Sequence, residues 1–132
     1  MKKGFTLLEL IVVIIIIGIL GTLGFTQYSK VIERGRSAEA RAILGTLRTA
    51  ENAYFLDKGN YTASLTGLAV DVGSATVCDA TNTANYFMYG LTAPTNTTFN
   101  ATATRCTTGG KSPVGTTAYT ITIDQAGNWT GI

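Results

Sequence analysis

Glu9 is the residue whose chemistry is hardest to reconcile with its surroundings. From Phe5 to Phe25 the sequence reads FTLLELIVVIIIIGILGTLGF, and Glu9 is its only charged residue. A carboxylate inside an apolar span costs at least about 2.5–3.5 kcal/mol on membrane-insertion scales, so it needs a partner or a role. We therefore take Glu9 as a candidate functional residue.

The second candidate group is Cys78 and Cys106, the two cysteines of a chain that has no histidine. An even number of cysteines in an exported chain favours a disulfide bond. The bond would close a loop of about 29 residues and stabilise the fold by roughly 3–4 kcal/mol in the chain-entropy treatment. The alternative is a pair of buried free thiols.

The apolar segment around Glu9 is long enough to cross a membrane. Its 21 residues would span about 32 Å as a helix, against roughly 30 Å for the hydrocarbon core. Lys2 and Lys3 precede it and would hold the N-terminus on the cytoplasmic side. A secretory signal peptide rarely carries such a carboxylate and no Ala-x-Ala site follows, although the small Gly21 and Gly24 keep that alternative open. A plain membrane anchor gains nothing from Glu9.

Residues 4–9, GFTLLE, follow two lysines and precede a long aliphatic run, and they resemble the class III signal of type IV pilins and type II secretion pseudopilins. The resemblance implies that prepilin peptidase cuts after Gly4 and that Phe5 becomes the N-methylated amino terminus. It also implies that Glu9 accepts the amine of Phe5 on a neighbouring subunit. Electrostatics supports this last role, because pairing an ammonium with a carboxylate in one low-dielectric layer relieves two desolvation penalties.

Three features depart from the family pattern. Many pilins carry a proline near position 26, where this chain has Thr26; the glycines between Gly18 and Gly24 either loosen the helix instead or allow close packing of membrane helices. Many pilin disulfides enclose a segment near the C-terminus, whereas 26 residues follow Cys106. Major pseudopilins commonly end in an acidic calcium-binding loop, but Asp124 is the single acidic residue in the last third of this chain.

The apolar segment should continue without a break into a second, amphipathic half. No proline or turn signal interrupts it, which predicts one helix from about Phe5 to Asp57, capped by Gly59. At about 1.5 Å per residue this helix would be roughly 80 Å long, so its outer half must project from the membrane. Apolar residues at three- and four-residue steps mark its covered face: Ala40, Ile43, Leu47, Ala50 and Tyr54. Two pairs are spaced to form ion pairs on the outside: Glu33 with Arg36, and Arg48 with Glu51.

The remainder of the chain predicts a small sheet. Gly59–Asp79 is typical of a loop with a short helical turn near Ser64–Leu68. Strands are predicted at Tyr86–Leu91, Phe99–Arg105 and Ala118–Asp124. A turn at Gln125–Asn128 would return the chain as a partner strand over Trp129–Ile132. An antiparallel sheet with its apolar face on the helix would complete an α+β fold.

Charge and composition exclude several classes of function. The net charge is +2, and it falls to zero if the leader with its two lysines is removed, leaving eight basic and eight acidic residues. Such a balance suits side-by-side assembly and offers no direct nucleic-acid site. The sequence shows no histidine base, metal-ligand cluster, phosphate-binding loop or paired carboxylates. We therefore expect no enzyme activity, no metal and no cofactor.

Together with the resemblance, the sequence predicts a leader peptide over 1–4, a transmembrane and assembly helix over 5–27, an amphipathic helix over 28–58, and a loop and antiparallel β-sheet head over 59–132. The expected function is a structural subunit of a type IV pilus-like filament, assembled through its N-terminal helix after leader cleavage and serving adhesion, motility or DNA uptake. Its partners would be copies of itself, minor pilins, prepilin peptidase and the inner-membrane assembly machinery. The precursor would cross the inner membrane once, and the assembled filament would be extracellular. The alternatives are a type II secretion pseudopilin and, more remotely, a membrane-anchored binding module.

Overall fold

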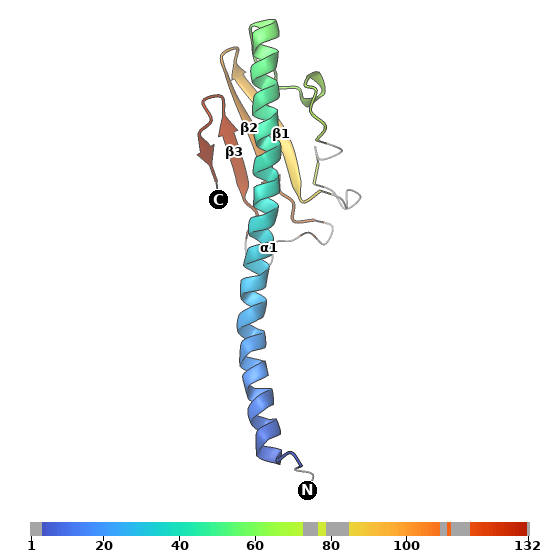
Figure 1. Ribbon diagram of the computed structural model, residues 1–132. Helices are drawn as coiled ribbons and strands as arrows, with labels where there is room; N and C mark the ends of the chain where they lie inside the picture. Colours follow the sequence, from blue (N-terminus) through green and yellow to red (C-terminus); the bar gives the residue numbers. More distant parts are fainter. Residues whose placement is uncertain (1–3, 73–76, 79–84, 109–110, 112–116, 132) are drawn as a thin grey trace.

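A long helix with a small sheet against its C-terminal half makes up the molecule (Figure 1). The structure, a computed structural model, describes residues 4–72, 77–78, 85–108, 111 and 117–131. In chain order the elements are the helix α1 (Leu7–Lys58), the 3-10 turn η1 (Leu65–Gly67), and the strands β1 (Phe87–Thr95), β2 (Thr98–Arg105), β3 (Thr120–Asp124) and β4 (Trp129–Thr130). This is the α+β arrangement that the sequence predicts.

Local capping signals fix both ends of α1. At its start the Thr6 side chain accepts the backbone N–H of Glu9 while the Glu9 side chain accepts that of Thr6, which forms a capping box. At its end Gly59 has a φ of 77°, a left-handed conformation suited to glycine, and its N–H bonds the Phe55 carbonyl at 2.8 Å. The predicted cap at Gly59 is confirmed. The 52 residues of α1 measure about 78 Å.

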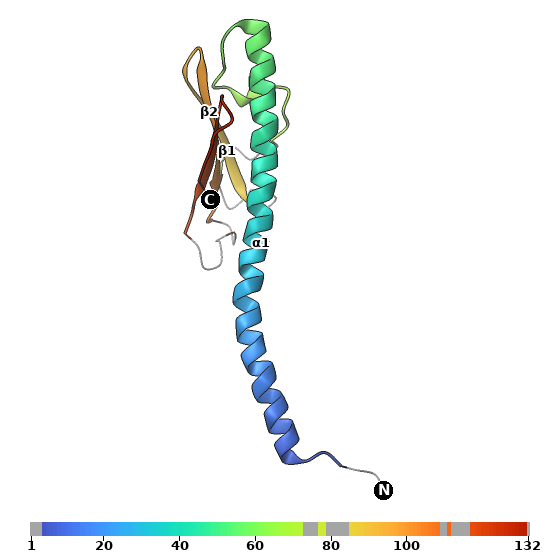
Figure 2. The ribbon, with the colours of Figure 1, turned by 60° about the vertical axis from the view of Figure 1, so that its left-hand side comes forward.

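The two halves of α1 have different surroundings. The N-terminal half extends well beyond the sheet (Figure 2), and its large apolar side chains from Leu7 to Phe25 are exposed. Within the described part of the chain, α1 is the one helix long and apolar enough to cross a membrane. The C-terminal half packs on the sheet. A single continuous helix therefore links an apolar segment that needs a cover to a head that has its own core.

The sheet is an antiparallel meander in the order β1-β2-β3-β4. The sequence predicts its first strand to end at Leu91, but β1 continues to Thr95, which pairs with Thr98 across a tight turn. Proline disfavours strand interiors because it lacks an N–H, and Pro94 lies among the residues that the prediction left out. The strand accommodates Pro94 at an irregularity, since the register shifts between Thr92 and Thr95.

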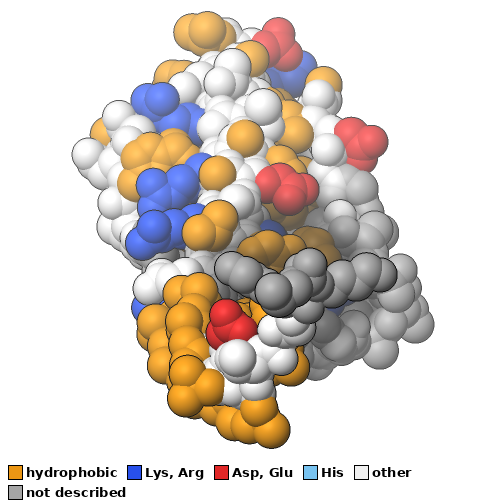
Figure 3. Space-filling model, turned by 60° about the horizontal axis from the view of Figure 1, so that its bottom comes forward, with side chains coloured by type: hydrophobic (Ala, Val, Ile, Leu, Met, Phe, Trp, Pro, Cys, Tyr) orange, Lys and Arg blue, Asp and Glu red, His pale blue; other side chains and the backbone are white. Residues whose placement is uncertain are grey.

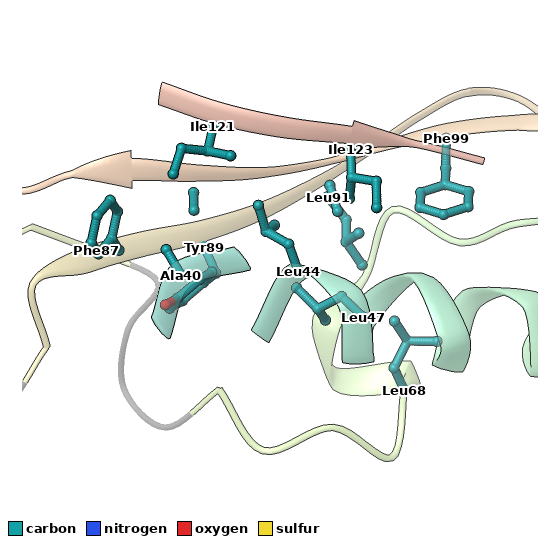
Figure 4. Close-up of a cluster of buried hydrophobic side chains, with 12 residues drawn as sticks. Ala40, Leu44, Leu47, Leu68, Phe87, Tyr89, Leu91, Phe99, Ile121 and Ile123 are labelled. Carbon is teal, nitrogen blue, oxygen red and sulfur yellow. The ribbon is translucent and has the colours of Figure 1, made fainter. Parts of the chain in front are cut away.

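One face of the sheet and one face of α1 enclose the core (Figure 4). The residues of β2 alternate strictly between buried and half-buried positions, as a half-covered strand requires. The predicted helix face is confirmed, since Ala40 and Leu47 are buried while Ile43, Ala50 and Tyr54 are partly buried against the core. Leu44, which the prediction did not include, is fully buried on the same face. The core comprises Ala40, Leu44, Leu47, Leu68, Phe87, Tyr89, Leu91, Phe99, Ala101, Ala103, Ile121 and Ile123.

Candidate functional site

The segment that precedes α1 is open to solvent. Gly4 is exposed, the Phe5 side chain is 85% exposed, and Thr6 is extended with φ −84° and ψ 150°. A Cβ at Gly4 would meet no atom within 4 Å. The peptide bond between Gly4 and Phe5 therefore lies outside the helix, between two exposed residues.

Glu9 has a partner within its own chain that the sequence prediction missed. Its Oε2 accepts hydrogen bonds from the backbone N–H and the hydroxyl of Thr6, both at 2.9 Å. The spacing Thr6-x-x-Glu9 is the signature of a capping box and could have revealed this contact. The carboxylate therefore points back toward the start of the helix, where Phe5 immediately precedes Thr6. The pairing of Glu9 with the Phe5 amine of another subunit stays a prediction, because the structure holds one chain.

A buried ion-pair network joins α1 to the end of β2. Arg105 binds the Glu33 carboxylate through both oxygens, with Nε–Oε1 at 2.6 Å and Nη2–Oε2 at 3.2 Å. The Tyr119 hydroxyl donates to Oε1 at 2.8 Å, and Arg36 lies 3.4 Å from Oε2, which confirms the predicted Glu33–Arg36 pair. Burial acts to raise the pKa of Glu33, but Arg105, Tyr119 and Arg36 outweigh it and hold that pKa below its ordinary value. Burial and the neighbouring carboxylate raise the pKa of Tyr119 to about 12.

The same network reaches the disulfide. The side chain of Arg105, which is almost fully buried, also donates to the carbonyls of Tyr86 at 3.2 Å and Cys106 at 2.8 Å. Cys106 is bonded to Cys78, as predicted, with a Cα–Cα distance of 5.3 Å. The helix, the end of β2 and the disulfide-closed segment are thus fixed at one point.

A second acidic residue, Glu51, is buried against the sheet side of α1. Its Oε2 accepts the Thr62 N–H at 3.1 Å, and Oε1 has no partner within the described residues. Burial raises the pKa of Glu51, although the Thr62 hydrogen bond acts in the opposite direction.

The predicted surface pair of Arg48 with Glu51 is wrong. Glu51 shares the buried face of the helix with Leu47, whereas Arg48 lies at the edge of that face. Arg48 instead donates from Nε and Nη2 to the Gln125 carbonyl at 3.3 and 3.2 Å. The side chain of Arg48 therefore holds the turn between β3 and β4 against the helix.

The described residues assemble no metal-binding group of three or more His, Cys, Asp or Glu side chains. A pocket of about 200 Å³ lies beside α1 and is lined in part by Glu39 and Asp71. Its described lining combines these two carboxylates with the aromatic rings of Tyr86, Phe87 and Tyr89.

Comparisons with known proteins give two family matches. The family described as "Type IV minor pilin ComP, DNA uptake sequence receptor" matches residues 26–116. The family described as "Prokaryotic N-terminal methylation motif" matches residues 1–25, which include the segment before α1 and its first turns. No curated protein and no solved structure matches the chain.

Proposed function

We propose that this chain acts in DNA uptake as a minor subunit of a type IV pilus. The chain belongs to the type IV minor pilin ComP family, whose model matches residues 26–116. The observation that carries this proposal is the pair of matches, one across the upper helix and head and one across the N-terminal segment. The long helix packed on a four-stranded antiparallel sheet is the architecture of such a subunit. The pseudopilin alternative is not better supported.

Assembly would begin with removal of residues 1–4. Gly4 and Phe5 are exposed and precede the helix, which supports cleavage between them and methylation of the new Phe5 amine. The apolar half of α1 must then exchange lipid for another apolar cover, because its side chains are exposed over some 20 residues. Neighbouring subunits would supply that cover, and Glu9 would meet the Phe5 amine of one of them.

Two measurements test this function. The intact mass of the chain in fibres sheared from cells should start at N-methylated Phe5 and lack two hydrogens because of the disulfide. Cells that carry Glu9→Ala should keep the protein in the membrane but lose both the fibre-associated chain and the uptake of DNase-protected labelled DNA. Asp57→Ala, which removes an exposed carboxylate at the other end of α1, is the matched control and should leave both unchanged. Normal DNA uptake in cells that lack the chain would refute the role in uptake.

A further inference from the structure

The pocket beside α1 that Glu39 and Asp71 line, which we name the acidic pocket, joins three parts of the chain. Glu39 lies in α1, Asp71 follows η1, and the three aromatic residues of the lining lie in β1 or immediately before it. Its described lining has these two carboxylates and no lysine or arginine. The volume of about 200 Å³ exceeds the roughly 150 Å³ that accommodates benzene, so the pocket can admit a group of several non-hydrogen atoms.

The hydroxyl of Tyr89 is the observation that points to a ligand. The Tyr89 side chain is 5% exposed, and its hydroxyl has no hydrogen-bond partner among the described residues. Buried polar atoms usually have a partner, because an unpaired hydroxyl has lost its hydrogen bonds to water. Figure 4 shows the Tyr89 ring reaching from β1 toward α1. Since Tyr89 lines the acidic pocket, its hydroxyl is placed to bond a group held there.

Charge around this hydroxyl favours a positive group. Burial, and after it the charge of Glu39, raises the pKa of Tyr89 to about 12, so the hydroxyl keeps its proton at neutral pH and can accept a hydrogen bond from an N–H donor. Glu39 is exposed and has no ion pair within the part of the chain that the structure describes. Arg36, whose guanidinium carbon lies 3.9 Å from the centroid of the Tyr86 ring, is bound to Glu33. In Figure 3 most Lys and Arg side chains lie on the left of the molecule, whereas Asp and Glu side chains with hydrophobic side chains beside them lie on the right.

We propose that the acidic pocket binds a primary ammonium group carried on an alkyl chain, as a lysine side chain or a free amine presents it. An ammonium has three N–H donors and no acceptor, so it can donate to both the Glu39 carboxylate and the Tyr89 hydroxyl. Asp71 adds a second negative charge to the pocket. The aromatic rings cover the alkyl chain and attract the cation through their faces. This site does not depend on the proposed role in DNA uptake.

Water and a metal ion are the competing occupants. Several waters of about 30 Å³ each would fit the pocket, but its aromatic rings offer them few hydrogen bonds. Calcium requires six to eight oxygen ligands, and the described residues assemble no group of three or more acidic, histidine or cysteine side chains. An alkylammonium uses both the charged and the apolar part of the lining.

The test measures binding by NMR to the peptidase-processed chain in a nonionic detergent. The methyl signals of Ile43 and Val72, which line the acidic pocket, report on its occupancy. The probe is n-butylamine, which is charged at pH 7, and 1-butanol is its uncharged counterpart of equal length. The amine should shift both signals to saturation and bind at least about tenfold more tightly than the alcohol, because its hydrogen bonds are charge-assisted.

Self-association separates the two sources of the ammonium group. The processed chain keeps three lysines, of which Lys30 is exposed, Lys58 contacts Asp57 and Lys111 is buried. Association in sedimentation velocity that both Lys30→Gln and excess butylamine reduce would identify a lysine of a second copy as the occupant. Binding of butylamine without such association would assign the pocket to a free amine.

Three variants decide whether the named groups hold the cation. Glu39→Gln should weaken the binding of butylamine about tenfold, and Tyr89→Phe, which keeps the buried ring, about fivefold. Asp57→Asn removes a negative charge outside the pocket and should bind as the unaltered chain does. Unchanged binding in Glu39→Gln, equal binding of amine and alcohol, or absence of amine binding to the unaltered chain would each overturn the proposal, the last leaving water as the occupant.

Discussion

Removal of either partner of the Glu33–Arg105 pair should destabilise the head severely. Arg105→Met keeps much of the side-chain volume but leaves the Glu33 carboxylate without its two-point partner, and it removes one hydrogen bond from each of two carbonyls. Glu33→Met leaves the guanidinium of Arg105 charged at 1% exposure. Breaking a buried pair by removing one partner costs about 3–5 kcal/mol. Because domains are typically stable by about 5–15 kcal/mol, each variant should lose a large part of its stability.

The double variant Glu33→Met with Arg105→Met measures the coupling energy between the two side chains. Replacement of both charges by methionine removes the unpaired charge that each single variant leaves behind. The double variant should therefore be less destabilised than the sum of the singles, with a coupling energy of about 2–3 kcal/mol. The double variant should still have a lower free energy of unfolding than the unaltered chain. The Tyr119 hydroxyl and two carbonyls each lose a hydrogen bond worth about 1 kcal/mol.

Urea unfolding of the processed chain in detergent, followed by Trp129 fluorescence, measures these differences in the head. Lys58→Met is the matched control, because it breaks the exposed pair with Asp57 and should leave the free energy of unfolding unchanged within error. Additive effects of Glu33→Met and Arg105→Met, or a loss below about 1 kcal/mol in either, would refute the argument that the network holds the sheet on the helix.

Three further outcomes are expected. Glu51→Gln should stabilise the head by about 1 kcal/mol at pH 7. Burial raises the pKa of Glu51 in the folded state, so the charged carboxylate present at pH 7 destabilises the fold, and the neutral amide removes that cost. That gain should disappear as pH falls below the ordinary value of 4.5, where the carboxyl is neutral in both states, and urea unfolding at the two pH values checks it. Cys78→Ser with Cys106→Ser should lower the free energy of unfolding by about 3–4 kcal/mol relative to the oxidised unaltered chain, for the loop that the bond closes; urea unfolding measures it, and the reduced unaltered chain should match the variant. Gly4→Asp should block leader removal, so that intact mass shows chains that start at Met1; recovery of chains starting at Phe5 would contradict the cleavage assignment.

Features set by local signals were predictable from the sequence. The helix follows from an uninterrupted run without proline that ends at Gly59, and its observed bounds, Leu7–Lys58, differ from the prediction by two residues or fewer. The alternation of Ile121 and Ile123 with threonines predicts a half-buried strand, and these two residues are buried in β3. Such signals depend on neighbours within a few residues, so one sequence is enough to show them.

Contacts between distant residues were not predictable in this way. Glu33 and Arg105 are 72 positions apart, and nothing in the spacing of either residue identifies the other. The same reason explains the error at Arg48, whose tertiary partner Gln125 is 77 positions away and replaces the local partner Glu51. The count of charges over the whole chain likewise carries no information on where they lie, so it did not locate the buried pair of Glu33 and Arg105.

The turn that precedes β4 fixes the position of this short strand. Trp129 and Thr130 are both exposed, so this two-residue strand contributes little to the core. Its place is set instead by the turn before it, where Gly127 has a φ of 93° and lies so close to Arg48 that a Cβ there would be 3.1 Å from the guanidinium carbon. A side chain at position 127 would displace Arg48 or the turn, and with the turn the indole beside Arg41. A glycine and an arginine thus hold the exposed indole of Trp129 beside Arg41, an arrangement that packing of the core does not require.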